Sequence, residues 1–233
     1  MDTIVLDDPE AVAHAAASRV ATALAAPRPV TLGLAGGRTP EATYRILVDA
    51  PIDWNRVTMW LGDERWVPPD DPNSNERMVR AALVDAVRGN LLSPDYTHGD
   101  PVIAAGAYGA ALEAAWTVRE GLRVPDLVLL GMGPDGHTAS LFPGSAMLDA
   151  PDRTYVAGWV EAKNTWRLSA TLSLLRSARD VIFLVTGGAK ADVVARILDR
   201  GEPFPAQRVA AGAHTVTWLL DEDAASALQR RPR

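Results

Sequence analysis

The chain has 233 residues, of which 48% are hydrophobic and 22% charged, a composition typical of a globular protein that needs no disulfide or metal to fold. Its 23 basic and 29 acidic side chains give a net charge of −6, which argues against general binding of nucleic acid or anionic membranes. It contains no cysteine, and this excludes thiol nucleophiles, disulfide frameworks and cysteine zinc sites.

The N-terminal sequence MDTIVLDDPE lacks the basic and long apolar regions of a secretory signal, and no apolar run approaches the length of a bilayer span. Together with the lack of cysteine, these features fit a cytoplasmic protein. We expect residues 1–233 to form a single domain.

Short apolar runs alternate with longer amphipathic stretches. In chain order they predict a helix over 9–25, a strand over 30–34, a helix over 40–48, a strand over 57–61, helices over 74–87 and 104–121, strands over 126–130 and 181–186, a helix over 189–200 and a strand over 216–220. Several of the strands are apolar without strict alternation, as expected for strands covered on both faces. The pattern predicts an α/β fold: a doubly wound, mostly parallel sheet with helices on both faces.

In such sheets ligands bind beyond the carboxyl ends of the strands, so the segments that follow the predicted strands deserve the closest inspection. Gly36 and Gly37 follow the strand over 30–34, and Thr39 and Pro40 suit the N-cap and first position of the next helix. Two glycines and a helix N-terminus favour a phosphate, and Arg38 adds positive charge. The alternative is an ordinary glycine turn before a capped helix.

Two acidic residues, Asp63 and Glu64, follow the strand over 57–61 and precede Arg65. On an extended chain neighbouring side chains point in opposite directions, so the two acids are not a paired acid–base site. We expect one to face the crevice and the other to pair with an arginine. The following loop is rich in turn-forming residues and is expected to end in a helix cap at Ser74 or a neighbouring residue. The alternative is a solvated acidic turn.

A G-x-G-x-x-G pattern follows the strand over 126–130, with Glu161 near the spacing that a dinucleotide fold requires. We reject that interpretation. Asp135 within the loop would repel a pyrophosphate, and the Pro143 and Gly144 pair ends any helix after little more than one turn. The glycines of the pattern are Gly131, Gly133 and Gly136.

The same loop presents His137, whose side chain suits general base chemistry near neutral pH. A lone histidine is usually structural, but one in a glycine-rich strand exit is a better functional candidate. No two histidines of the chain have metal-ligand spacing; the other three are His14, His98 and His214.

Two cations complete the set of candidates. Lys190 lies in a second strand–Gly–Gly–helix segment, in the predicted first turn of the helix, where a cation is unfavourable unless an anion binds there. Arg167 precedes an alternating run. Alone, each is more simply a surface charge. Together with residues 36–39 they are candidates to surround one phosphate.

At this point the chain resembles the 6-phosphogluconolactonase family, within the wider glucosamine-6-phosphate isomerase/6-phosphogluconolactonase superfamily. The matching segments, in the family's order, are LAGGRTP, WLGDERWVPPDDPNSN, DLVLLGMGPDGHTASLFPG, RLSATLSLL, FLVTGGAKA and VTWLLD. The resemblance implies a doubly wound α/β fold and a cytoplasmic enzyme of the oxidative pentose phosphate pathway. It implies hydrolysis of 6-phospho-D-glucono-1,5-lactone to 6-phosphogluconate without a metal or organic cofactor.

By position, the resemblance implies that His137 is the general base, with Asp63 as the strand-end acid and Asp135 as the loop acid. It does not separate the roles of the two acids, which are to orient the imidazole or to bind sugar hydroxyls. Many relatives have serine where this chain has Arg38. The implied phosphate and substrate contacts are Gly36, Gly37, Arg38, Thr39, Arg65, Arg167 and Lys190, with Lys163 left open.

Three alternatives are weighed against this function. The isomerase/deaminase branch carries a glutamate shortly after the histidine and typically reads DEY; here TASLFPG follows His137, no acid precedes Asp149, and the motif reads DER. A sugar-phosphate sensor is expected to lose the acid–histidine pair or to add a DNA-binding module. A nicotinamide-dependent dehydrogenase is excluded by the loop chemistry above. The expected partner is a small sugar-phosphate lactone, with neither nucleic acid nor membrane, bound by a monomer or homodimer.

Overall fold

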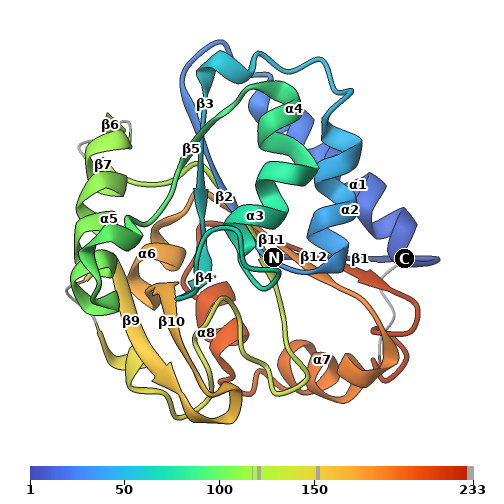
Figure 1. Ribbon diagram of the computed structural model, residues 1–233. Coiled ribbons are helices and arrows are strands. Elements are labelled where there is room, and N and C mark those ends of the chain that lie inside the picture. Colours follow the sequence, from blue (N-terminus) through green and yellow to red (C-terminus); the bar gives the residue numbers. More distant parts are fainter. Residues whose placement is uncertain (117, 120–121, 151–152, 230–233) are drawn as a thin grey trace.

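The computed structural model describes residues 1–116, 118–119, 122–150 and 153–229 (Figure 1). Its centre is a seven-stranded sheet in which every strand pairs in parallel with its neighbours. The strands lie in the order β1 (Asp2–Leu6), β12 (Thr215–Asp221), β11 (Asp180–Val185), β8 (Leu127–Gly131), β2 (Val30–Leu34), β3 (Val57–Leu61) and β5 (Asn90–Leu92).

The strand order reverses between β2 and β8. From β2 the chain proceeds outward through β3 to β5, whereas from β8 it proceeds the other way through β11 to β12. The loops that leave β2 and β8 therefore diverge and open a crevice at the carboxyl ends of the strands. The predicted strand-exit segments all lie at this end of the sheet.

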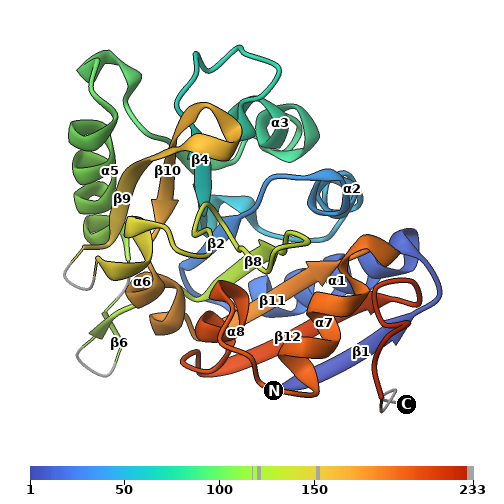
Figure 2. The same cartoon turned by 90° about the horizontal axis from the view of Figure 1, so that it is seen from below.

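Helices cover both faces of the sheet, as predicted. One face packs on α1 (Pro9–Leu24), α2 (Arg38–Leu47) and α3 (Asn75–Val79), which continues through a π-helical segment (Arg80–Val84) into α4 (Asp85–Val87). The other face packs on α5 (Pro101–Ala115), α6 (Leu172–Ser177), α7 (Ala191–Leu198) and α8 (Pro205–Ala210). Figures 1 and 2 both show α2 and α3 on the opposite side of the molecule from α5 and α6.

Alternation along the strands divides the apolar core in two. In β8, Leu127 and Leu129 face α1 and α2, whereas Val128 and Leu130 face the side of α5 to α8. Gly33 in β2 leaves room for the indole of Trp60, because a methyl group there would lie 2.6 Å from the ring. Burial on both faces explains why the strands are apolar throughout.

A small antiparallel sheet stands beside the crevice. It is made of β4 (Asp63–Arg65), β10 (Thr165–Ala170) and β9 (Tyr155–Val160), and its register places Arg65 opposite Arg167 and Asp63 opposite Ser169. Strands β6 (Val118–Arg119) and β7 (Leu122–Arg123) form a separate two-stranded antiparallel sheet. Short 3₁₀ turns span Trp54–Arg56, Tyr96–His98, Ala146–Asp149, Glu161–Lys163 and Gly188–Lys190. None of the described helices combines the length and the apolar character that a bilayer span requires.

The structure confirms every predicted strand to within a residue or two, and the Ser74 cap, whose hydroxyl accepts a 3.1 Å hydrogen bond from the Arg77 N–H. The helix predicted over 104–121 is wrong at both ends: it begins at Pro101, capped by Asp100, and ends at Ala115. Residues 117 and 120–121 of that prediction lie outside the described residues. The sequence pattern did not predict β1, β4, β5, β6, β7, β9, β10, α6 or α8.

Asp126 joins the two halves of the sheet at the end away from the crevice. Its buried Oδ2 accepts a 2.9 Å hydrogen bond from the Thr31 N–H, and its own N–H donates to the Thr31 hydroxyl at 2.8 Å. Arg28 lies 3.1 Å from Oδ1 of the same carboxylate. The two strands share only the pairs Leu32↔Leu127 and Gly33↔Val128, so these side-chain bonds extend a short ladder.

We predict that Asp126→Ala lowers the free energy of unfolding by about 2 kcal/mol, because it leaves a buried backbone N–H without its acceptor. Urea unfolding followed by circular dichroism measures the change. Asp53→Ala, which removes a half-exposed carboxylate paired with Arg56, is the matched control. An effect no larger than that of the control contradicts the prediction.

Candidate functional site

A cavity of about 540 Å³ lies at the carboxyl ends of β2, β3, β8 and β11, at the point where the strand order reverses. We call it the strand-end cavity. It brings together all of the sequence-predicted site residues except Asp135. The lining consists of residues 35–40, Gly62, Asp63, Arg65, Asn75, residues 130–133, His137, Ala139, Ser140, Phe142, Lys163, Arg167, Leu184, Thr186, Gly187, Ala189 and Lys190.

The first glycine loop opens the cavity beside α2. The N-cap of this helix is Gly37, with a φ of +114°, and not the predicted Thr39, so the helix begins at Arg38, two residues earlier than expected. No side chain caps this end, which leaves backbone N–H donors available to an anion. Glu41 does not occupy that position, since its carboxylate lies 2.6 Å from Arg45 one turn along the helix.

The second glycine loop follows β11. Its Gly187 N–H is not available to a ligand, because it donates to both oxygens of the buried Asp221 carboxylate at 3.0 and 2.9 Å. Lys190 ends the 3₁₀ turn and precedes α7, rather than lying in the first turn of that helix as predicted. The hydroxyls of Thr39 and Thr186 lie 2.9 Å apart and join the two loops.

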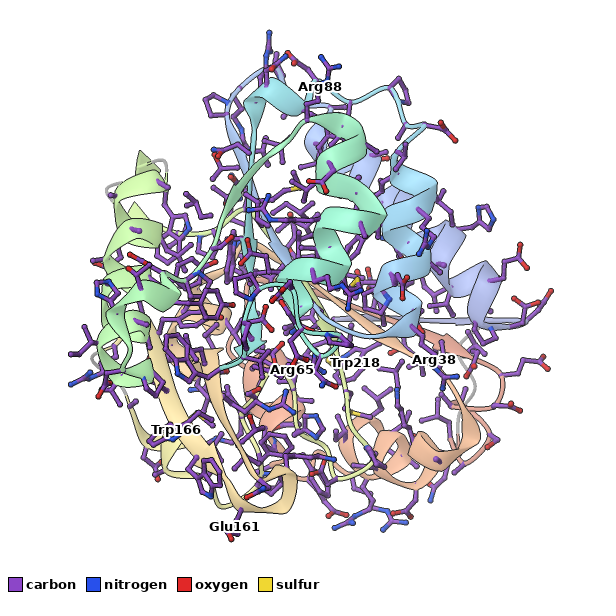
Figure 3. The ribbon with its side chains drawn as sticks, viewed as in Figure 1. Arg38, Arg65, Arg88, Glu161, Trp166 and Trp218 are labelled. Atoms are coloured by element: carbon purple, nitrogen blue, oxygen red, sulfur yellow. The ribbon has the colours of Figure 1, made fainter. Side chains whose placement is uncertain are left out.

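Cations dominate the charge of the strand-end cavity. Its described lining holds Arg38, Arg65, Arg167, Lys163 and Lys190 against a single carboxylate, that of Asp63. None of these five cations forms an ion pair with another described residue. In a chain whose net charge is −6, this local excess of positive charge favours an anionic ligand. Figure 3 shows Arg38 at the start of α2 and Arg65 on β4.

Two of these cations are partly withdrawn from solvent. Burial lowers the pKa of the Lys190 ammonium, an effect that Asp221 opposes and Arg38 reinforces. Burial also lowers the pKa of the Arg167 guanidinium, against the attraction of Asp63, and its Nε is buried with no hydrogen-bond acceptor among the described residues. A bound anion would relieve both costs.

The DER segment forms β4, and the side chains alternate as predicted. Asp63 and Arg65 face the cavity, whereas Glu64 is fully buried on the other side. The expectation that the second acid pairs with an arginine is wrong. Its carboxylate instead accepts hydrogen bonds of 2.7 to 3.0 Å from four donors: the N–H groups of Arg65, Asn75 and Glu76 and the hydroxyl of Ser74.

His137 lies in a tight loop after β8. Its Nδ1 lies 2.5 Å from Oδ1 of Asp135, and its ring packs on Phe142 with a centroid separation of 4.2 Å. Desolvation disfavours the Asp135 carboxylate, but the hydrogen bonds from His137 outweigh it and hold the pKa of Asp135 below its usual value. Gly133 makes room for the imidazole, since a methyl group in its place would overlap the ring.

The two candidate acids have different surroundings. Asp135 lies outside the lining of the strand-end cavity, beside a larger neighbouring cavity of about 800 Å³, and its partner is the imidazole. Asp63 lies inside the strand-end cavity and accepts a 2.6 Å hydrogen bond from the Ser140 hydroxyl and a 3.2 Å bond from the Asn75 amide. Sequence reasoning missed Ser140 and Asn75 as site residues, although both stand in the motifs quoted for the family.

Comparison with known proteins agrees with this geometry. Residues 7–218 match the family model described as glucosamine-6-phosphate isomerases/6-phosphogluconolactonase. The chain belongs to this family. The match confirms the resemblance inferred from the six sequence segments.

The similarity to individual relatives extends over almost the whole length of this chain. A 6-phosphogluconolactonase from Synechocystis is 35% identical over 219 residues, which span 91% of this chain and 90% of the relative. One from Mycobacterium leprae is 37% identical over 227 residues, 90% of each chain. The structure of a 6-phosphogluconolactonase from Trypanosoma brucei is 29% identical, with a TM-score of 0.89 over 97% of this chain and 98% of that one. A monomeric glucosamine-6-phosphate deaminase shares the fold, with a TM-score of 0.84 at 23% identity.

Because the pKa of Lys190 is lowered, we predict that the cavity loses affinity for a phosphate-bearing anion, with 6-phosphogluconate as the probe, at a lower pH than an ordinary lysine, with its pKa of about 10.4, would allow. The sign follows from the charge: raising the pH removes the proton and with it the attraction for the phosphate. Isothermal titration calorimetry between neutral and alkaline pH measures the effect. Lys190→Arg, which stays charged, should abolish this part of the pH dependence. An identical pH dependence in both proteins contradicts the prediction.

Proposed function

We propose that this protein hydrolyses 6-phospho-D-glucono-1,5-lactone to 6-phospho-D-gluconate in the cytoplasm, as one domain over residues 1–233. The observation that carries the proposal is that His137 and the unpaired cations line the same cavity. A phosphate held by the cations would place the rest of a small sugar beside the imidazole. The names of the relatives support the same substrate.

The reaction needs a base and an acid, and one imidazole serves as both. Asp135 accepts a hydrogen bond from Nδ1–H of His137, which leaves the lone pair on Nε2. As a water oxygen bonds to C1 of the lactone, Nε2 takes its proton. When the tetrahedral intermediate collapses, the bond between C1 and the ring oxygen breaks and Nε2 returns the proton to that oxygen. The new carboxylic acid then ionises.

The two acids have separate roles in this mechanism. Asp135 orients the imidazole and stabilises it when it is protonated, because it contacts Nδ1. Asp63 lies in the cavity with both carboxylate oxygens hydrogen-bonded and is suited to accept hydrogen bonds from sugar hydroxyls. The cations and the open N-terminus of α2 hold the phosphate.

Lactone hydrolysis by the purified protein, followed by NMR or polarimetry on fresh substrate and corrected for spontaneous ring opening, tests the proposal. An ammonia assay with glucosamine 6-phosphate is run in parallel. Release of ammonia without lactone hydrolysis contradicts the proposal in favour of the other branch of the family. Ligand binding without turnover of either substrate favours a sensor.

His137→Ala is expected to lower kcat by about 10²- to 10⁴-fold, the usual contribution of a positioned base, with little change in KM. The same lactone assay measures both constants. His98→Ala, which removes a histidine outside the cavity, is the control. Turnover by the His137 variant at the rate of the control would refute the assignment of the base.

Arg167→Ala is expected to act mainly on KM. Loss of one charge-assisted hydrogen bond to the phosphate costs about 2 kcal/mol, or roughly a 30-fold rise in KM, while the imidazole and its water are untouched. Arg45→Ala removes an exposed arginine that pairs with Glu41 and is the matched control. If kcat falls and KM does not rise, Arg167 does not bind the phosphate.

A further inference from the structure

One side chain of the strand-end cavity contacts an acid and a cation at once. The Asn75 amide donates from Nδ2 to the backbone carbonyl of Asp63 at 2.8 Å and to Oδ1 of the Asp63 carboxylate at 3.2 Å. Its Oδ1 accepts a hydrogen bond from the Arg65 guanidinium. Only this orientation of the amide satisfies all three partners, because the carboxylate and carbonyl need a donor and the guanidinium needs an acceptor.

A hydrogen bond on the side away from the cavity fixes the position of Asn75. Its backbone N–H donates at 2.7 Å to the fully buried Glu64, which lies between Asp63 and Arg65 in the sequence but points away from the cavity. Burial raises the pKa of Glu64, against the opposing effect of the backbone N–H groups that it accepts. On its other side the amide packs against the first glycine loop. A methyl group at Gly36 in that loop would overlap the amide.

The position of Asn75 keeps two neighbouring opposite charges from forming an ion pair. Asp63 and Arg65 are two residues apart on one strand, so their side chains lie on the same face, where a carboxylate and a guanidinium normally attract each other. A direct ion pair would neutralise both groups and turn them away from a ligand. The described residues show no such pair, and the amide of Asn75 stands between the two groups.

We infer that Asn75 is a positioning residue that keeps Asp63 and Arg65 apart, so that the acid faces the sugar and the cation faces the phosphate. The inference rests on the proposed lactonase function. Asn75 acts through its two neighbours and takes no part in the bond changes. Ser140 positions only the acid, because its hydroxyl donates a hydrogen bond to the other carboxylate oxygen of Asp63 and, among the described residues, makes none to Arg65.

This division predicts different kinetics for two variants. Asn75→Ala releases both neighbours, so kcat should fall and KM should rise, each by about 10-fold or more, as expected when groups that position the substrate are misplaced by an ångström. Ser140→Ala releases only Asp63, which faces the sugar and not the phosphate, so kcat should fall while KM rises less than in Asn75→Ala. Asn73→Ala, in the same loop but bonded to Asp71 outside the cavity, should leave both constants unchanged.

If Asn75 had a purely structural role, Asn75→Ala would lower the thermal midpoint of unfolding, but it would not raise KM more than Ser140→Ala does. The inference is overturned if Asn75→Ala folds and both constants stay within twofold of the wild type, or if Ser140→Ala raises KM as much as Asn75→Ala does. If Asn75→Ala does not fold, Asn75→Ser replaces it, since one short hydroxyl cannot hold both neighbours. The same outcomes then apply.

Crystal structures of the wild type and the Asn75 variant, free of ligand, test the inference without turnover. The Arg65 guanidinium should move onto the Asp63 carboxylate in the variant and stay apart from it in the wild type. An ion pair in the wild type, or an unchanged separation in the variant, overturns the inference. A wild-type protein that does not hydrolyse the lactone overturns the proposed function alone, because these structures decide the role of Asn75 independently.

Discussion

The organisation of this protein depends on one electrostatic constraint: several cations are held in one cavity, and none of them pairs with a carboxylate in the part of the chain that the structure describes. Such an arrangement costs free energy, because like charges repel and burial disfavours each of them. Lys190 and Arg167 show the cost as lowered pKa values. Burial of the two apolar layers of the parallel sheet offsets this cost. In the proposed function, a bound phosphate would relieve the repulsion among the cations.

Backbone groups and neutral side chains, rather than opposite charges, hold this cavity open. Glu64 is satisfied by backbone N–H groups and a hydroxyl, and Asp221 by the N–H groups of Gly187 and Ala224. The acids that shape the site are thus occupied by uncharged donors. Had they paired with Arg65 or Lys190, the ligand would have had to compete with a carboxylate for each cation. The selectivity of the cavity for an anion therefore depends on Glu64 and Asp221 being hydrogen-bonded to neutral donors and not to the cations.

Much of this was predictable from the sequence, for physical reasons that also explain the omissions. Contiguous apolar runs marked the strands of the central sheet because both of their faces are buried, and glycine-rich exits marked the cavity. β10 was missed because its side chains serve three environments in turn: Trp166 is partly exposed, Arg167 lines the cavity and Leu168 is buried. The helix start at Arg38 was misplaced because proline is tolerated throughout the first turn of a helix, and here Pro40 is the third helical residue. Asn75 stands in the quoted motif WLGDERWVPPDDPNSN, but the sequence does not show that its amide contacts both Asp63 and Arg65.

The hydroxyl contact between Thr39 and Thr186 links loops that leave strands on opposite sides of the reversal in strand order. Residues in direct contact show non-additive effects when they are substituted, so changes at these two hydroxyls are expected to be coupled although they lie 147 residues apart in the chain. The geometry of each glycine loop therefore depends in part on a residue of the other loop.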